Sequence, residues 1–353
     1  MRFRSIITAA LLLASLEAHA QFLYRLPPAP DLYSPCDTVS IYIIGDVMMH
    51  SRQLEYNHRT FLSHIEPYMQ EADFCVANME FPLGGRPYTG YPSFSTPDWY
   101  PVYVAGCGAD VFLLANNHVL DRGPAGLART LRVYDRLADS LGTKYTGIGC
   151  EPLLLHKHGI KVALVNFTYG TNMGPQDSKA DVMRMRTEQV SVALDSAKAS
   201  GADFIVALPH WGAEYELRHN QTQANWARWL AEKGCCAIVG GHPHVVQDTT
   251  HIGKVPVIYS LGNAVSNMSA INTRLELAVT LRFVNDHITG EKTMLEPQLE
   301  WLWCTLPGML TTSYATVRIK DWATRRSEWL NPSDYDNMCA TLLRVEAATG
   351  IGR

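Results

Sequence analysis

The chain ends a short apolar run with two glycines and two histidines in CAIVGGHPHVVQ, residues 236–247. A turn needs only the glycines, so the histidines indicate chemistry. Gly240 and Gly241 let the backbone turn sharply and approach a ligand closely, and Pro243 stiffens the segment. Because residues two apart on an extended chain project to the same side, we expect His242 and His244 to face one bimetal centre.

Five further apolar runs end in the same manner. Their exits are GDVMMH, VANME, LLANNHVLDRG, VALPHWGAEYE and YSLGN. The metal-capable or hydrogen-bonding residues at all six exits are Asp46, His50, Asn78, Glu80, Asn117, His118, Asp121, His210, Glu214, His242, His244 and Asn263. The carboxyl ends of strands in open α/β sheets face one crevice, so we expect these groups to converge. A lone histidine is more often an ordinary core or surface residue, but repetition at successive exits favours a site.

The elements that would position these residues alternate along the chain. Buried strands are expected at residues 39–44, 74–77, 111–115, 204–208, 236–239 and 257–259. Helices are expected at residues 61–70, 124–137, 187–199 and 221–232. Residues 153–155 and 161–167 flank His158-Gly159 as a hairpin. This order is typical of a layered α/β fold with buried strands.

From Arg274 onward the hydrophobic pattern changes and predicts strands at residues 275–283, 294–303 and 315–319, followed by a closing helix at 333–348. No segment has the composition of a flexible linker that would separate independent domains. We therefore divide the chain into a signal peptide (1–20), a Pro-rich lead-in (21–38), a core (39–270) and a β-rich extension with a terminal helix packed on the core (271–353).

The amino terminus carries the pattern of a secretory signal. Arg2 and Arg4 precede an apolar stretch, and Ala18-His19-Ala20 supplies the small residues for cleavage before Gln21. An anchoring helix needs about 20 apolar residues, whereas Glu17 ends this run earlier. No later stretch is apolar enough to span a bilayer. We therefore expect a periplasmic or extracellular protein with no integral membrane span in the mature chain.

The composition limits the classes of partner. The chain has 353 residues, of which 47% are hydrophobic and 18% charged, as in a core-building globular protein. A net charge of -4 provides no polycation for nucleic acid, so any anionic substrate must be bound by local chemistry. The eight cysteines include no CxxC pair, and buried thiols are favoured over a disulfide framework.

Six motifs, taken in order and spacing, resemble one known family. GDVMMH, NMEFPL, NNHVLDRG, HWGAEYE, GGHPHVVQ and YSLGN look like the motif series of the CapA family of capsule and poly-gamma-glutamate biosynthesis proteins. The resemblance covers residues 40–265. That family is in turn similar to the calcineurin-like metallophosphoesterases. The resemblance implies a four-layer α/β/β/α sandwich with a two-metal site between its sheets.

The resemblance also assigns ligands at the first two motifs. Asp46 matches a metal ligand of the metallophosphoesterases, but Met48 stands where those enzymes keep a histidine, and His50 is the candidate substitute. Their bridging aspartate has its nearest counterpart in Glu80, with Asn78 beside it.

The later motifs carry the remaining roles. Asn117, His210, His242 and His244 match metal ligands, and His118 matches a proton donor or transition-state contact. The residues with two open interpretations are Asp121 (orienting His118 or capping the next helix), Trp211 and Tyr215 (crevice wall or core), Glu214 (binding a ligand amine or a second imidazole) and Asn263 (contact near the metals or turn).

The chemistry implied is that of two divalent cations, which lower the pKa of a bridging water and neutralise a tetrahedral oxyanion. Imidazole and carboxylate ligands suit zinc, manganese or iron. Two function classes stay open. One is an exported metal-dependent hydrolase or transferase that acts on a phosphoester, amide or polymer linkage in a cell-envelope polymer or its precursor. The other is a non-catalytic component of polymer assembly or export, in contact with capsule synthesis proteins.

Overall fold

The computed structural model describes residues 36–173 and 181–352. The predicted signal peptide and residues 21–35 of the lead-in lie outside this part of the chain. Residues 286–291 form a small unit with the end of the lead-in, in which His287 Nε2 lies 2.9 Å from Asp37 Oδ2. The main unit contains residues 38–285 and 292–352, and the description below concerns this unit.

The first sheet has the strand order β14-β13-β11-β1-β2-β3-β4, with β12 paired to β11. Its strands are β1 (Cys36–Val47), β2 (Phe74–Met79), β3 (Val111–Leu113), β4 (Lys144–Thr146), β11 (Leu275–Asp286), β12 (Lys292–Met294), β13 (Gln298–Thr305) and β14 (Ala315–Arg318). Strands β1 to β4 run parallel, whereas β11, β13 and β14 pair antiparallel with one another. The strands after residue 270 thus belong to the same sheet as β1, and the division of the chain at that point stays a prediction.

The second sheet has the order β5-β6-β7-β8-β10-β9. Its strands are β5 (Leu153–Lys157), β6 (Ile160–Thr168), β7 (Phe204–His210), β8 (Ala237–Val239), β9 (Thr249–Ile252) and β10 (Val255–Ile258). Strands β6, β7, β8 and β10 are parallel, and the edge strands β5 and β9 are antiparallel. The hairpin predicted around His158-Gly159 is the β5–β6 pair.

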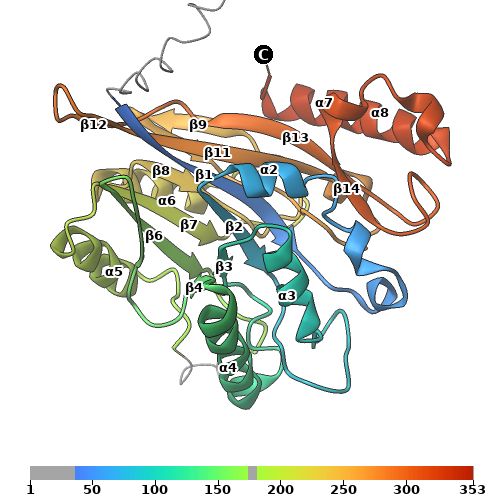
Figure 1. Cartoon of the computed structure of the whole chain (residues 1–353), viewed down its shortest axis with the longest axis horizontal. Helices are drawn as coiled ribbons and strands as arrows, with labels where there is room; N and C mark the ends of the chain where they lie inside the picture. The colour runs from blue at the N-terminus through green and yellow to red at the C-terminus, as the bar shows by residue number, and fades with distance from the viewer. Residues whose placement is uncertain (1–35, 174–180, 353) are drawn as a thin grey trace, which may run out of the picture. The chain divides into compact units, whose positions relative to one another are not determined.

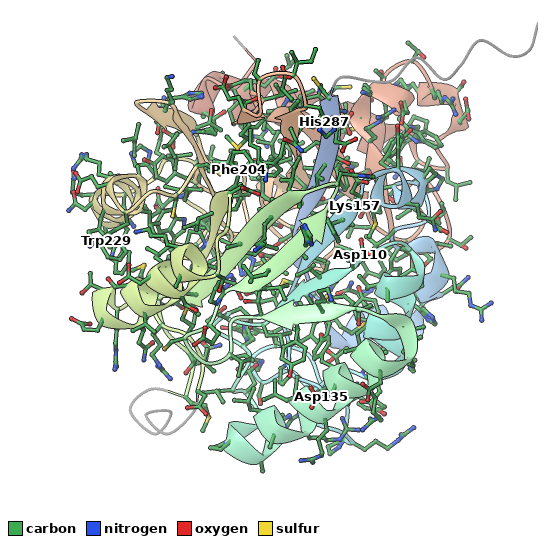
Figure 2. All side chains as sticks on the ribbon, turned by 60° about the vertical axis from the view of Figure 1, so that its left-hand side comes forward. Asp110, Asp135, Lys157, Phe204, Trp229 and His287 are labelled. Carbon is green, nitrogen blue, oxygen red and sulfur yellow. The ribbon has the colours of Figure 1, made fainter. Side chains whose placement is uncertain are left out.

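Alternation along the strands builds the layers. Tyr42 and Ile44 of β1 pack with the helices that cover the first sheet, whereas Ile41 and Ile43 pack toward the second sheet. The covering helices are α2 (Glu66–Glu71), α3 (Trp99–Gly106) and α4 (Gly123–Leu141) on the first sheet, and α5 (Thr187–Ala199) and α6 (Gln221–Glu232) on the second. Figure 2, in which Asp135 marks α4 and Trp229 marks α6, shows the sheets between these helices. The expected four-layer α/β/β/α sandwich is confirmed.

The remaining elements are short helices and the closing helix. They are the 3-10 turns η1 (Ser51–Glu55), η2 (His58–Thr60), η4 (Ile271–Arg274) and η5 (Arg326–Glu328), together with α7 (Ile319–Trp322) and α8 (Pro332–Thr349). Met338 and Val345 of α8 join the apolar cluster between the sheets, so the predicted terminal helix packs on the core.

Two predicted elements are wrong in extent, both at prolines. The helix expected at residues 61–70 begins only at Glu66, because Pro67 is favoured in a first turn and excluded from a helix interior. The strand expected at residues 294–303 is split into β12 and β13 around Pro297, which has no N–H to donate to a ladder. Sequence periodicity also missed α3.

Two expectations about the chain's surroundings concern membranes and thiols. Within the described residues, no helix combines the length and apolar character needed to cross a bilayer. Cys75, Cys107, Cys235 and Cys304 are buried, whereas Cys150, Cys236 and Cys339 are half-buried, and the prediction of thiols rather than a disulfide framework stays a prediction.

Candidate metal centre

The predicted site residues gather where the parallel strands of the two sheets end. Asp46 lies near the end of β1, Glu80 directly follows β2, His210 ends β7, and His242 follows β8 by three residues. A backbone bridge joins His210 to Gly241, so the β7 and β8 exits lie side by side. The crevice rule for strand ends therefore places residues from both sheets in one cluster.

Asp46 is fully buried and fixed on both oxygens. Its Oδ1 accepts a hydrogen bond from Asn78 Nδ2 at 2.7 Å, and its Oδ2 accepts from the His242 backbone N–H at 3.2 Å. His244 Nδ1 lies 3.5 Å from the same Oδ2. Burial alone would raise the pKa of the Asp46 carboxyl, but the His244 contact and the charges of His210 and His244 hold it below its ordinary value.

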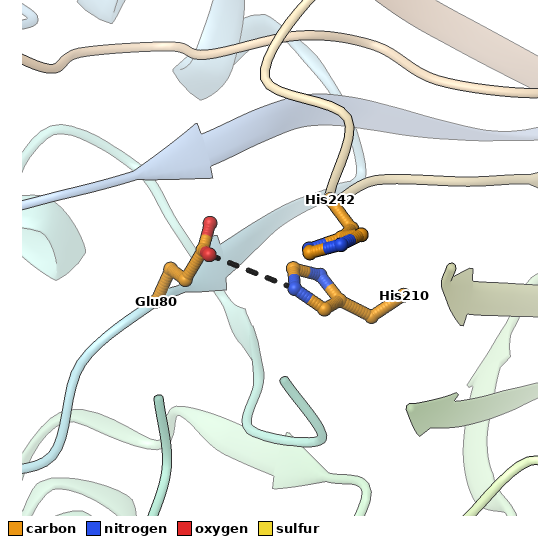
Figure 3. A group of neighbouring side chains, drawn as sticks. All are labelled: Glu80, His210 and His242. Atoms are coloured by element: carbon orange, nitrogen blue, oxygen red, sulfur yellow. Dashed lines mark ion pairs between the residues drawn. The ribbon is translucent and has the colours of Figure 1, made fainter. Parts of the chain in front are cut away.

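Glu80 is the second buried carboxylate, and it is unsatisfied. Its Oε1 lies 3.6 Å from His210 Nε2 and 3.7 Å from His244 Nε2, beyond hydrogen-bond distance. Both of its oxygens are buried without a hydrogen-bond partner, as is Nδ1 of His242. Figure 3 shows the Glu80 carboxylate facing the His210 ring, with the His242 ring alongside. A buried charge left open in this way is costly unless a cation compensates it.

The ligand atoms form three overlapping groups, each within 4.8 Å: Glu80 with His210 and His242, Asp46 with Glu80 and His244, and Glu214 with His242 and His244. Glu80, His242 and His244 each belong to two of these groups, so the groups form one connected cluster. Imidazole nitrogens and carboxylate oxygens form a donor set that fits zinc, manganese or iron. The described residues therefore fit a divalent cation.

The two histidines of the HPH turn differ in charge. Burial and the neighbouring imidazoles His210 and His244 hold the pKa of His242 well below its ordinary value, so its ring is neutral and able to bind a metal. Burial alone would also lower the pKa of His244, but the charge of Glu80 and the contact with Asp46 raise it to about 10. Without metal, His244 thus carries a proton between the two carboxylates.

The premise that this turn is extended is wrong. His242 has φ 97 and His244 has φ 59, both in the left-handed region that residues other than glycine seldom adopt. The rings still converge, with centroids 5.9 Å apart. Gly240 and Gly241 have ordinary φ values and serve close packing instead: a Cβ on Gly240 would lie 2.3 Å from the Tyr259 carbonyl oxygen, and one on Gly241 would lie 2.9 Å from Asp46 Oδ1.

The family of the chain follows from comparison with known proteins. The bacterial capsule synthesis protein PGA_cap family matches residues 40–268, about the stretch over which the six motifs occur. The chain belongs to this family.

Curated relatives and a solved structure extend the comparison. The PGA_cap chain is 26% identical over 264 residues to the capsule biosynthesis protein CapA of Bacillus anthracis, and 25% identical over 257 residues to the PGA biosynthesis protein CapA of Bacillus subtilis. These matches cover 70% and 67% of the chain but 64% and 66% of the relatives, slightly less than two thirds of each. A hypothetical protein from Thermus thermophilus is 15% identical, with a TM-score of 0.45 over 74% of this chain and 98% of the other.

His118 and Asp121 of the PGA_cap chain form a buried pair beside the cluster. His118 Nδ1 lies 2.7 Å from Asp121 Oδ2, which also accepts the Phe94 N–H at 2.8 Å. The N-cap position of α4 is Arg122, and no side chain caps the helix. Of the two roles left open for Asp121, its contacts fit the orientation of His118.

Asparagines support the cluster from several strands. Asn117 Oδ1 lies 2.8 Å from His210 Nε2, which joins the β3 exit to the β7 exit. Asn263 Oδ1 lies 2.9 Å from His244 Nδ1, so this residue contacts the site rather than merely ending a strand. Asn78 both donates to Asp46 and lies 3.3 Å from His210 Nδ1.

Three supporting asparagines were missed by the sequence analysis. Asn116 donates to the Met79 carbonyl at 2.9 Å, and Asn172 Nδ2 lies 3.1 Å from His118 Nδ1. Asn166 joins the sheets, since its Oδ1 accepts the Ala115 N–H at 2.9 Å and its Nδ2 donates to the Leu208 carbonyl at 2.8 Å. A usable signal existed, because β6 runs parallel to β7 and ends at the same edge.

The other predicted site residues lie outside the cluster or at its mouth. Of the two interpretations left open for Trp211, its contacts fit the core and not the crevice wall: its indole is fully buried in the apolar cluster under α5 and α6, and Nε1 donates to the Tyr259 carbonyl. His50 accepts the Asn267 N–H at 3.2 Å and belongs to none of the three ligand groups found in the described residues. Glu214 and Tyr215 are exposed beside the HPH turn, to which the Tyr215 N–H donates at the Pro243 carbonyl.

Proposed function

We propose that this PGA_cap chain is an exported, metal-dependent hydrolase of the phosphoesterase type. It acts on a cell-envelope polymer, or its precursor, during capsule or poly-gamma-glutamate type polymer production. The relatives named capsule biosynthesis and PGA biosynthesis proteins support the process. The metal-ligand cluster and the adjacent His118–Asp121 pair support the reaction.

The observation that carries the proposal is the state of Glu80. A fully buried carboxylate with no hydrogen-bond partner faces His210, His242 and His244. His244 lies 3.7 Å away and offsets part of this charge, but no group donates a hydrogen bond to either oxygen, and a buried carboxylate in this state is costly unless a cation binds to it. Asp46, Glu80, Asn117, His210, His242 and His244 would hold the divalent cations, two in number on this proposal.

The chemistry divides between the cations and the chain. When bound, such cations supply Lewis acidity that activates water and neutralises charge on a phosphoryl group. Asp121 engages Nδ1 of His118, which leaves Nε2 as the nitrogen that gives a proton to the leaving group. Asn263 holds the His244 ring, and Asn78 holds the Asp46 carboxylate, so both ligands are fixed before a substrate arrives.

A second candidate, a non-catalytic component of polymer assembly or export, is favoured by one observation. Met48, which stands where metallophosphoesterases keep a histidine, is 2% exposed and packed in the apolar cluster under α2 to α4. Met48 supplies no metal ligand. A two-metal site that lacks this ligand would bind one of its ions weakly and would hold a single ion.

The experiment that separates the two candidates measures metal content and turnover together. Purified protein is assayed for bound Mn, Zn and Fe and for hydrolysis of p-nitrophenyl phosphate, beside His242→Ala and a control, His251→Ala. His251 is an exposed histidine paired with Glu296 at 2.9 Å, away from the cluster. Two equivalents of metal with turnover lost only in His242→Ala support the hydrolase. One equivalent or none, without turnover, supports the assembly component.

A further inference from the structure

Three exposed tyrosines surround the mouth of the metal cluster. Tyr91 is 74% exposed, Tyr169 44% and Tyr215 49%, although aromatic side chains are usually covered. The Tyr169 ring lies 4.5 Å from the His242 ring between centroids, and the Tyr91 ring lies 6.5 Å from that of His118. Two of these rings thus border a candidate ligand and the candidate proton donor.

The backbone ties Tyr169 and Tyr215 to the segments that carry the site. The Tyr169 N–H donates to the His210 carbonyl, and the Tyr215 N–H donates to the Pro243 carbonyl, both at 2.9 Å. Next to Tyr91, the Gly90 N–H donates to Ser51 Oγ at 2.8 Å. Tyr215 also has φ 68, an uncommon conformation for a bulky residue. The rings of Tyr169 and Tyr215 are therefore positioned with the cluster rather than placed by chance on a surface loop.

The charges nearest these rings are carboxylates. Burial, with the charges of Glu214 and Glu80, raises the pKa of the Tyr169 phenol to about 12, so the ring stays neutral. Burial, with Glu214 and the neighbouring Tyr91, raises the pKa of Tyr215 as well. A linear polycarboxylate entering over the rings would place several like charges beside Glu214, whereas a substrate with a single phosphate group leaves a neutral portion to lie there, which favours the latter.

Resting on the proposed phosphoesterase function, we propose that Tyr91, Tyr169 and Tyr215 form an aromatic rim that binds a sugar ring, so that the substrate is a glycosyl phosphoester. Aromatic faces are electron-rich and attract the polarised C–H bonds along one face of a pyranose. The hydroxyls of such a ring match the phenol oxygens, the Glu214 carboxylate and the Asn172 amide beside His118.

The test compares substrates that share a phosphate but differ in what it carries. Values of kcat/KM are measured for glucose 1-phosphate, glycerol 3-phosphate and adenosine 5′-monophosphate, with tetraglutamate as a competitor. Wild-type protein is expected to favour glucose 1-phosphate over glycerol 3-phosphate at least tenfold. Tyr169→Ala and Tyr91→Ala each lower that ratio about tenfold. Tyr169→Phe keeps the ratio because it keeps the ring, and so does the control Tyr145→Ala, which changes a tyrosine on β4.

Other outcomes overturn the rim without touching the proposed hydrolysis. Equal turnover of glucose and glycerol phosphates, a preference for the nucleotide, or strong competition by tetraglutamate would each reject the sugar assignment. If no phosphate ester is hydrolysed, the proposed function fails, and glucose 1-phosphate binding by saturation-transfer NMR then decides the rim. Binding that is lost in Tyr169→Ala upholds it; absent binding, or binding unchanged in that variant, rejects it.

Discussion

Among the buried charged groups of the main unit, two clusters are built in opposite ways. Arg274, at the end of η4, meets Asp334 of α8 through two hydrogen bonds of 2.6 Å. Its Nε donates to the Cys304 carbonyl, its guanidinium lies over the Trp303 ring, and Trp303 Nε1 donates to Asp334. In the cluster around Glu80, the Glu80 carboxylate itself has no contact of this quality, since the imidazole nitrogens of His210 and His244 lie 3.6 and 3.7 Å from its Oε1.

The difference is the one expected between a charge with a structural role and a charge with the role proposed above. Both clusters are removed from water, so each must offset a similar desolvation cost. The Arg274 cluster, which we call the closed cluster, offsets this cost with its own side chains and joins α8 to the sheet. The Glu80 cluster, which we call the open cluster, does not fully offset the desolvation cost with its own side chains. This is expected of a site that binds a group from outside the chain.

The largest expected effect comes from breaking the closed cluster. Arg274→Met leaves Asp334 buried and unpaired, which should lower the free energy of unfolding by about 3–5 kcal/mol. Urea denaturation measures this loss. The matched control is Arg326→Met, which removes an equally bidentate pair with Asp336 at the surface. A comparable loss in both variants would show that burial does not distinguish the two ion pairs.

The second largest effect on stability is expected when a metal ion binds to the open cluster. Manganese or zinc at a hundred times its dissociation constant should stabilise the wild-type protein by about 2.7 kcal/mol. Glu80→Gln keeps the size of the side chain but removes its charge, so we expect little metal-dependent gain and, without metal, a far smaller loss than in Arg274→Met. Thermal unfolding with metal and with chelator measures both. An undiminished gain in Glu80→Gln would exclude this carboxylate as a ligand.

The sequence predicted the members of the open cluster because strand exits are visible as apolar runs that stop at polar residues. The structure brings together Asp46, Glu80, Asn117, His210, His242 and His244. The two sheets and the helices α5 and α6 were predicted as well. The sequence did not reveal the left-handed HPH turn, because the conformation depends on packing against Asp46 and Tyr259 from distant segments.

The closed cluster was not predicted at all. Arg274 and Asp334 are 60 residues apart, and neither lies in a pattern that specifies a partner. Tyr169 and Asn172 were missed for a different reason, since the β6 exit was treated as half of a hairpin and not as a further strand end. Trp211 was assigned by its neighbour His210, although successive residues at a strand end project to opposite faces.

The smallest expected effect on stability concerns the His118–Asp121 pair, in which one imidazole nitrogen is bound to the carboxylate and the other is available to a substrate. His118 is held at Nδ1 by Asp121, at 2.7 Å, while its second nitrogen has to serve the substrate. Asp121→Asn retains an oxygen for the Phe94 N–H but no longer stabilises a protonated imidazole, so turnover should fall about tenfold to a hundredfold. Metal content and unfolding free energy should stay near the wild-type values. Comparison of kcat with the free energy of unfolding distinguishes this role from a structural one, because only a residue that positions His118 should lower kcat without lowering stability. Unchanged kcat with reduced stability would place Asp121 with the closed cluster, as a residue that only holds the loop around Phe94.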